Sequence, residues 1–305
     1  MRRPTISIVL AVLILAGSIA AAQDADSAKV KPAQVTFVYP LGTNGASSLD
    51  YTNNLSFNIL FGLNGGVAGA ELGGVFNYTK GDVKWAQVAG VFNMNKGDTR
   101  GVQLAGVFNA DFQDFSGLQV GVVNYSRKVT GLQVGVVNIA ENAERGVPIG
   151  LINIIKGGHY ELEMTGGDVV YANTNFKMGV ERFYSIIKAG VSSFNGSPVY
   201  SAGLGLGGAV KLGEKQKINI DVSTNSIVYN NSLPIEKKNA LNKLDVNYKF
   251  EFSPKFSLLI GPSLNVYIAD DDTLNVPYTI YSAASSSGTN TSIWVGANAG
   301  LSYRF

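Results

Sequence analysis

The sequence predicts an all-β protein, specifically an antiparallel, up-and-down transmembrane β-barrel of about 14–16 strands. Three observations lead to this prediction. Long segments of the C-terminal half alternate apolar and polar residues with the two-residue period of a strand. A short phrase ending in Asn recurs six times in the N-terminal half. The 305 residues include 36 Gly, 14 Tyr and 15 Phe, a composition that favours strands and tight turns over helices.

The N-terminus has the three parts of a secretory signal peptide. Arg2 and Arg3 supply positive charge, residues 6–16 are apolar, and the Ala residues at 20–22 form a small-residue cleavage site. The apolar run is shorter than the roughly 20 residues that a membrane-spanning helix needs. We therefore expect a signal peptide over 1–22, a flexible polar lead-in over 23–32, and a single barrel domain over 33–305.

Charge balance and the lack of cysteine exclude several classes of protein. The chain has no Cys, so it has neither a disulfide framework nor a cysteine that could carry a lipid. Removing Arg2 and Arg3 from the 24 basic residues leaves 22, which equals the 22 acidic residues. Binding of nucleic acid requires clustered Lys and Arg. No nucleic-acid partner is therefore expected.

Two strands are expected before the repeats. Residues 34–40 place Val35, Phe37 and Tyr39 on one face. Residues 54–63 alternate in the same way, and Asn64-Gly65-Gly66 then gives a turn signal.

The repeat block covers residues 66–155. Its six phrases, such as QLAGVFN and QVGVVN, are separated by steps of 16, 16, 15, 14 and 15 residues. A Gly lies three positions before each final Asn. The phrases end at Asn77, Asn93, Asn109, Asn124, Asn138 and Asn153.

Two interpretations of the repeats compete. In the first, each repeat is one strand plus a tight turn of the barrel wall, and Lys80-Gly81-Asp82 has hairpin-turn chemistry. In the second, segment 66–155 is a β-solenoid joined to a barrel, with Gln and Asn ladders stacked inside it. The face that carries Gln103 and Asn109 consists of small or semi-polar residues, and this composition does not decide between the two interpretations. We favour the barrel wall, because a solenoid would be awkward to join to barrel strands.

The last 13 residues give the clearest strand. From Ile293 to Phe305, apolar residues on one face alternate with polar or small residues on the other. A transmembrane barrel strand needs about 9–11 residues with this pattern. We expect this strand to direct membrane insertion, with Leu301, Tyr303 and Phe305 on its apolar face.

Upstream strands carry charges on the face opposite their apolar residues, and we expect these charges to face the lumen. They could set the selectivity of a pore, or they could simply solvate a polar interior. They are Lys217, Asp221, Lys243, Asp245, Lys249 and Glu251.

Connection lengths predict how the barrel is oriented. The joins near Gly213 and Pro254 are short, whereas those at 229–240 and 269–291 are long and polar. Outer-membrane barrels have short periplasmic turns and long extracellular loops. We therefore expect the outer membrane of a Gram-negative-type bacterium, with the long loops at the cell surface. The expected partners are membrane lipid and the outer-membrane insertion machinery, while an extracellular partner cannot be named.

The repeats also resemble a known family. GVQLAGVFN (101–109) and GLQVGVVN (117–124 and 131–138) are similar to the surface repeat-containing proteins of spirochaetes and Bacteroidetes, in which G-V-Q-[IL]-A-G-[LIV]-x-N recurs. PIGLINI at 148–154 and the segments at 158–160 and 182–184 resemble the way those arrays close. The resemblance covers roughly residues 55–190 and implies a surface or outer-membrane location, but no activity. Glu71 and Pro148 depart from the motif at the two ends of the array.

No catalytic, cofactor or metal site is expected. His159 is the only His, and no neighbouring residue completes a metal or nucleophile set. Asp270, Asp271 and Asp272 are a weak Ca²⁺ candidate, because they lack the spacing of an EF-hand loop. The sequence therefore predicts a structural or surface-interaction protein with a narrow or occupied lumen. The alternative is a passive pore for small solutes.

Overall fold

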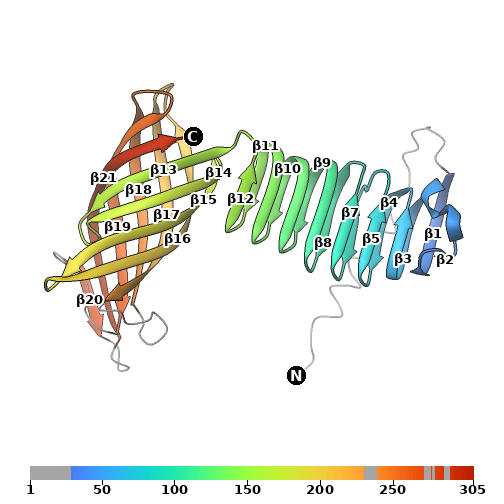
Figure 1. Cartoon of the computed structure of the whole chain (residues 1–305), viewed down its shortest axis with the longest axis horizontal. Helices are drawn as coiled ribbons and strands as arrows, with labels where there is room; N and C mark the ends of the chain where they lie inside the picture. The colour runs from blue at the N-terminus through green and yellow to red at the C-terminus, as the bar shows by residue number, and fades with distance from the viewer. Residues whose placement is uncertain (1–28, 230–238, 271–275, 277–278, 285–288) are drawn as a thin grey trace. The chain divides into compact units, whose positions relative to one another are not determined.

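The computed structural model describes residues 29–229, 239–270, 276, 279–284 and 289–305 (Figure 1). The predicted signal peptide therefore lies outside the described residues. The protein is all-β, with 78% strand and 2% helix. It divides into two compact units, residues 1–117 and 118–305. Among the described residues, none of the helices has the length and apolar character needed to cross a membrane.

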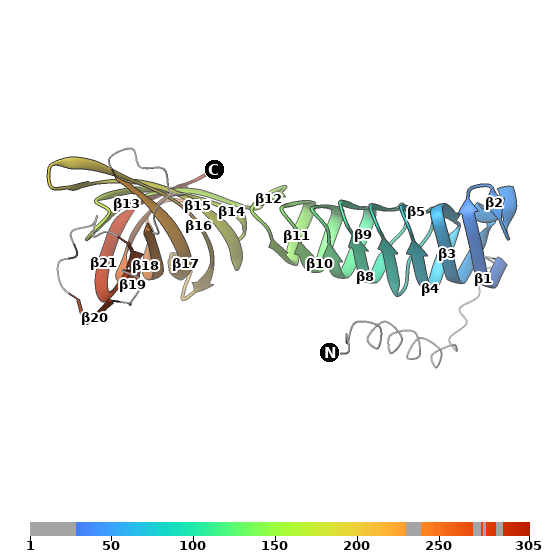
Figure 2. The same ribbon diagram turned by 90° about the horizontal axis from the view of Figure 1, so that it is seen from below.

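The first unit is a stack of flat coils made from parallel strands (Figure 2). Its first strand begins at Lys29, within the segment for which the sequence suggests a lead-in. The last strand continues past the unit boundary. The elements are β1 (Lys29–Val38), β2 (Leu41–Gly42), a 3-10 helix (Gly45–Asp50), β3 (Tyr51–Asn64), β4 (Gly66–Gly73), β5 (Phe76–Thr79), β6 (Ala86–Ala89), β7 (Phe92–Asn95), β8 (Thr99–Ala105) and β9 (Phe108–Val120).

Each coil of this unit contributes one strand to each of two parallel ladders. Strands β4, β6 and β8 form one ladder, and β5, β7 and β9 form the other. The 16-residue step sets the register, so Gln87 lies opposite Gln103 and Asn93 opposite Asn109. Neighbours in an up-and-down barrel wall would run antiparallel. The barrel-wall interpretation of the repeats is therefore wrong, and the solenoid alternative describes this stretch.

The second unit begins with further coils of the same kind. Asn124 pairs with Asn138, and Asn138 with Asn153, again in parallel register. These repeats have one residue fewer between Gln and Asn, and it is lost from the end of the strand before the glycine turn, since Val120 alone stands between Gln119 and Gly121. Gln119 and Asn124 both stay buried. The strands are β10 (Val123–Val134), β11 (Val137–Ile149) and β12 (Ile152–Ile155).

The remainder of the second unit is a closed antiparallel barrel (Figure 1). Within the described residues, eight strands pair in sequence order, and the ring closes between β13 and β21. The predicted 14–16 strands included the repeats, so the described ring is much narrower than predicted. Strand β20 pairs with the start of β21. The strands are β13 (His159–Gly167), β14 (Ala172–Val180), β15 (Phe183–Phe194), β16 (Ser197–Lys211), β17 (Gln216–Tyr229), β18 (Asn239–Glu251), β19 (Phe256–Ala269), β20 (Tyr281–Ala284) and β21 (Asn290–Arg304).

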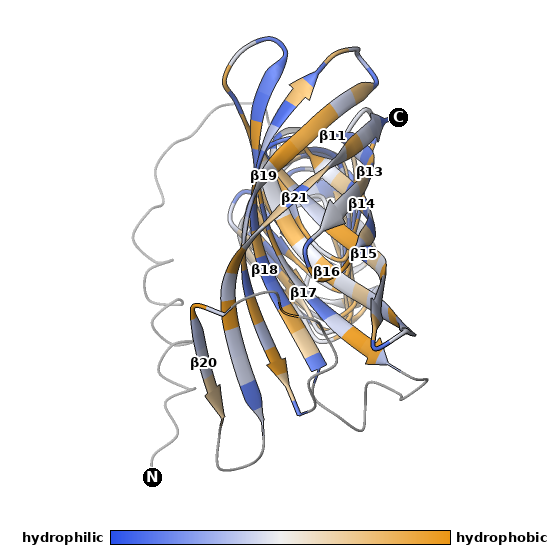
Figure 3. Ribbon diagram, turned by 90° about the vertical axis from the view of Figure 1, so that its left-hand side faces the viewer, coloured by the Kyte–Doolittle hydropathy of each residue, from blue (hydrophilic) through white to orange (hydrophobic). Residues whose placement is uncertain are grey.

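Polar and apolar residues alternate along the barrel strands (Figure 3). The burial of side chains alternates in the same way. On β17, Asn219 and Asp221 are buried, whereas Ile220 and Val222 are 45% and 58% exposed. The two-residue period of a strand sends neighbouring side chains to opposite faces of the sheet. The barrel therefore encloses its polar residues and presents its apolar ones.

Candidate functional site

The barrel interior is the candidate site, because it gathers the charges predicted from the sequence. Lys217, Asp221, Asp245 and Lys249 are buried, with exposed fractions of 5% or less. The side chains of Lys243 and Glu251 are 10% and 21% exposed. All of these charges come from β17 and β18. Leu301 and Phe305, which the sequence predicts to direct membrane insertion, lie on the opposite face of the sheet and are exposed.

Lys177 on β14 is the centre of the first ion-pair group. Its Nζ donates to Glu163 Oε1 at 2.6 Å and to Asp221 Oδ2 at 2.7 Å. The Tyr184 hydroxyl donates to the other oxygen of Asp221 at 2.8 Å. One buried cation therefore joins carboxylates from β13 and β17 across the barrel. Buried charges need close ion-pair and hydrogen-bond partners of this kind, because removing them from water costs several kcal/mol per ion.

A second group joins β13 to β18. Lys249 Nζ donates to both carboxylate oxygens of Glu161. His159 Nε2 lies 3.4 Å from Glu161 Oε2, and the His159 ring stacks on Tyr184 with centroids 5.1 Å apart. The lone His is thus part of the packing of the interior.

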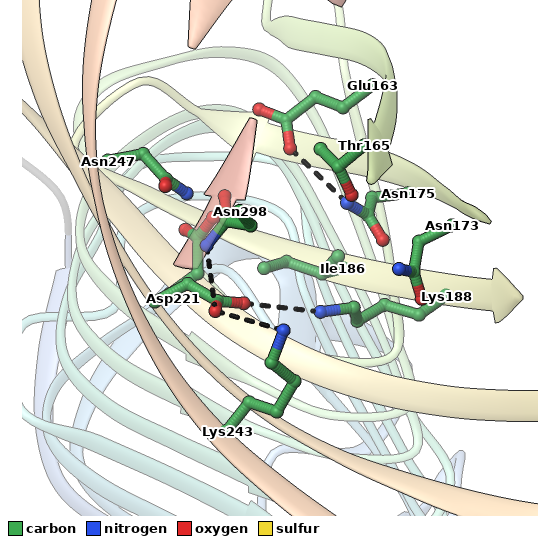
Figure 4. Close-up of a pocket in the computed structure, with 11 residues that line it drawn as sticks. Glu163, Thr165, Asn173, Asn175, Ile186, Lys188, Asp221, Lys243, Asn247 and Asn298 are labelled. Atoms are coloured by element: carbon green, nitrogen blue, oxygen red, sulfur yellow. Dashed lines mark hydrogen bonds and ion pairs between the residues drawn. The ribbon is translucent and has the colours of Figure 1, made fainter. Parts of the chain in front are cut away.

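Asp245 forms a third group with Lys188, Lys243 and Asn298, and Figure 4 labels these three partners. Its carboxylate lies 3.5 Å from Lys188 Nζ and 3.2 Å from Lys243 Nζ. Asn298 Nδ2 donates to it at 3.2 Å, and Lys188 also donates to Ser223 Oγ at 3.2 Å. Two cations therefore converge on one carboxylate.

Little free space remains beside the third group. The cavity beside Lys188 and Asp245 measures about 10 Å³, which is about the room of one water molecule. An eight-stranded barrel has an interior just wide enough for side chains to fill it. The interior offers no site for a substrate of several atoms at this cavity.

The long-loop end of the barrel is filled by apolar residues. Val169 and Val170, from the connection between β13 and β14, pack in a buried cluster with Leu241 and Trp294. Trp294 Nε1 donates to Asp168 Oδ2 at 2.5 Å, which fixes this connection inside the ring. Buried side chains therefore occupy the interior at this end as well as around Lys177.

Glu181 occupies the opposite end, in the turn between β14 and β15. It pairs with Lys217 and lies 2.9 Å from Lys211 Nζ. Partial burial raises the pKa of Glu181, but hydrogen bonds and charge from these two lysines outweigh it and hold the pKa at about 2. Glu181 therefore stays ionised, and its contacts tie the turn to β16 and β17.

Several members of the interior groups are absent from the prediction made from sequence. His159, Glu161 and Glu163 alternate along β13 in the same way as the predicted charges alternate along β17 and β18. On β14 and β15 the charges are isolated, so Lys177 and Lys188 give no local pattern.

No metal centre is found among the described residues, which contain no group of three or more His, Cys, Asp or Glu side chains suited to hold an ion. Asp270 accepts a hydrogen bond from Thr289 Oγ1 at 2.9 Å. Asp271 and Asp272, the other members of the Ca²⁺ candidate, lie outside the described residues. The Ca²⁺ hypothesis remains a prediction from the sequence.

Two buried carboxyl groups lie inside the coils of the first unit. Burial raises the pKa of Glu71, against hydrogen bonds from Gln87, Thr79 and Asn64 that lower it. Burial likewise raises the pKa of Asp111 to about 7, although a hydrogen bond from Thr99 lowers it. Asp111 stands opposite Asn95 of the preceding coil, so an ionisable group occupies a neutral position of the ladder.

Asp111→Asn is expected to remove a pH dependence from the coils. The pKa of Asp111 rises from 3.8 in the unfolded chain to about 7 in the folded coils, so ionisation favours unfolding by roughly 4 kcal/mol. Stability is greatest below about pH 4, falls as the pH rises to about 7, and changes no further above that. Hydrogen exchange of residues 99–112, at pH 5 and pH 8 and corrected for intrinsic rates, measures this loss.

The control for this prediction is Glu141→Gln, which removes an exposed carboxylate from a coil. The Glu141→Gln protein is expected to keep the pH dependence of the parent. If Asp111→Asn retains the same fall in protection between pH 5 and pH 8, Asp111 is not its source.

No protein-family model matches this chain, and the search of curated proteins gives no match either.

Proposed function

We propose that this chain is an integral outer-membrane β-barrel protein whose lumen is occupied by its own side chains, and that its role is structural or surface interaction. The observation that carries the proposal is the polarity of the barrel. Its inner face holds buried ion pairs, and its outer face is apolar. A soluble barrel has the opposite arrangement, whereas a barrel in lipid needs this one.

The apolar outer face extends over neighbouring strands of the ring. Contiguous apolar patches of a few hundred Å² are already unusual on soluble monomers. The strands β16 to β19 have 13 to 15 residues each, more than the roughly 9–11 that cross a bilayer. Exposed members include Leu204, Leu206, Ile220, Val222, Tyr248, Phe250, Leu258, Ile260, Leu264 and Val295.

An occupied lumen supports structure or surface interaction over transport. The passive pore needs a continuous aqueous path, but the interior is filled by ion pairs at its centre and by the cluster around Trp294 at its mouth. The sequence has long polar connections at 229–240 and 269–291, and we expect these to supply the contact surface outside the cell.

The location rests on the sequence. The signal peptide at 1–22 directs export, and the terminal strand with Leu301, Tyr303 and Phe305 supplies the segment for the insertion machinery. The resemblance to surface repeat-containing proteins points to the same place. We assign no enzymatic activity to the chain.

Membrane integration is expected in a direct fractionation. The expressed full-length protein should remain in the outer-membrane pellet after alkaline carbonate extraction, because lipid solvates the outer face of the barrel. It should also migrate faster in unheated than in heated detergent gels. Recovery in the carbonate supernatant, with both gel samples migrating alike, would contradict membrane integration.

A further inference from the structure

The coils of the first unit have their polarity reversed relative to a water-soluble solenoid. Polar side chains fill much of their interior, alongside buried apolar residues such as Val67, Val83 and Phe115, and apolar side chains cover both flat faces and one edge. The barrel proposal does not account for this apolar surface.

The interior of the coils is a set of hydrogen-bonded ladders. Asn77 donates to Asn93 at 3.0 Å, and Asn93 donates to Asn109 at 3.0 Å. Gln103 donates to Gln87 at 2.8 Å, and these side chains are fully buried. Backbone groups also pair between coils, so the groups of these ladders are hydrogen-bonded without water. A membrane-embedded structure must meet this condition.

The outward positions around the glycine edge are apolar in each coil. The edge itself carries Val75 and Val107, which are 39% and 43% exposed. One flat face carries Leu72, Val88 and Leu104, and the other carries Phe76, Phe92 and Phe108. Neighbouring phenylalanine rings on this face contact each other: Phe61 and Phe76 are stacked with centroids 4.9 Å apart, and Phe76 and Phe92 meet edge to face with centroids 6.2 Å apart.

The opposite edge of the same coils is charged. It carries the exposed residues Lys80, Asp82 and Lys84 in one coil, and Lys96 and Arg100 in the next. Each coil is therefore amphipathic in cross-section, with its apolar positions and its charges at opposite edges.

The coils of the second unit repeat the pattern. Val122, Val136 and Leu151 occupy their glycine edge with exposed fractions of 46%, 47% and 40%. Arg127 and Lys128 lie exposed at the other edge. The interior again holds hydrogen-bonded Asn and Gln ladders.

The dimensions of a coil fit one leaflet of a bilayer. Five residues separate Val91 at the glycine edge from Lys96 at the charged edge, which at about 3.3 Å per residue is roughly 16 Å. Half of the hydrocarbon core is about 15 Å thick. A second copy of the chain would cover one flat face, but the apolar residues occupy two faces and the edge between them.

We propose that the repeat coils insert their glycine edge into one leaflet, with lipid acyl chains as the partner of the apolar surface and the charged edge at the headgroups. The coils thus bind membrane from one side without crossing it. This goes beyond the insertion of the barrel and does not depend on it.

Single cysteines test the proposal, because the chain has none of its own. Val107→Cys and Val136→Cys place a polarity-sensitive fluorophore at the glycine edge, and Ser116→Cys places it at an exposed position of the other edge. Leu258→Cys on the barrel exterior is the reference. The full-length proteins are reconstituted in vesicles of phosphatidylethanolamine with a minor fraction of phosphatidylglycerol, with and without lipids that carry a quencher on the acyl chain.

Labels at 107 and 136 are expected to lose fluorescence to the lipid-borne quencher, while the label at 116 is quenched by aqueous iodide instead. If 258 is quenched by lipid but 107 and 136 are not, the coils do not insert and the barrel proposal stands. If 107 and 136 are shielded from both quenchers, protein covers the glycine edge and the proposal is overturned. If 258 is also unquenched by lipid, both proposals are overturned.

Discussion

Lys177→Met is expected to destabilise the barrel by roughly 3–5 kcal/mol, because removing one member of a buried ion pair leaves uncompensated charge. Lys177 is fully buried and is the cation that Glu163 and Asp221 share. Methionine fills a similar length without a charge. The two carboxylates then face each other in the interior, with the Tyr184 hydroxyl still bound to Asp221.

Urea unfolding of the protein in detergent micelles, followed by the shift between folded and heated gel bands, measures the loss. Lys211→Met is the matched control, since this lysine is 66% exposed and exposed ion pairs contribute little. Adding Glu163→Gln and Asp221→Asn to Lys177→Met is expected to restore much of the stability. A midpoint for Lys177→Met equal to that of Lys211→Met would show that the interior network does not stabilise the barrel.

Gly90→Ala is expected to cost about 3 kcal/mol in the coils, at the upper end for overpacking. A Cβ at this position would lie 2.1 Å from the carbonyl oxygen of Gly74 in the neighbouring coil. The contact is with backbone, which cannot move away without separating strands that lie about 4.8 Å apart. The same conflict recurs at Gly106, with the carbonyl oxygen of Gly90 at 2.2 Å.

Hydrogen exchange of residues 76–109 measures the effect of Gly90→Ala, which is expected to reduce protection in that coil and its neighbours. Gly213→Ala is the control, because a Cβ at 213 has no heavy atom within 4 Å. Unchanged protection in the Gly90→Ala protein would mean that the glycines of the repeat are not required by coil spacing.

The sequence predicts the strands well because their signal is local. Alternation along Gln216–Tyr229 and Asn239–Glu251 needs no knowledge of the partner strand, and Lys217, Asp221 and Lys249, which it assigns to the inner face, are buried. The partners of these charges are harder to predict, because Lys249 and Glu161 are 88 residues apart. Neither residue indicates the other until the ring closes.

The prediction that the repeats form a barrel wall is wrong because the residue pattern of one strand does not indicate whether the neighbouring strand runs parallel or antiparallel to it. An Asn register repeated every 14–16 residues is compatible with a hairpin wall and with a parallel stack. In the parallel stack, each residue pairs with the equivalent residue of the next repeat, as Asn77 does with Asn93. Identical side chains in register form hydrogen-bonded ladders. The sequence does not predict these ladders, because the face that carries Gln and Asn is too mixed in polarity to indicate that it is buried.

Planar-bilayer recording of the purified full-length protein examines whether the barrel spans the membrane with its lumen filled. We expect the protein to insert without a steady conductance, because the ion pairs around Lys177 and the cluster around Trp294 leave no continuous water path. A stable ohmic conductance would show that the lumen is open.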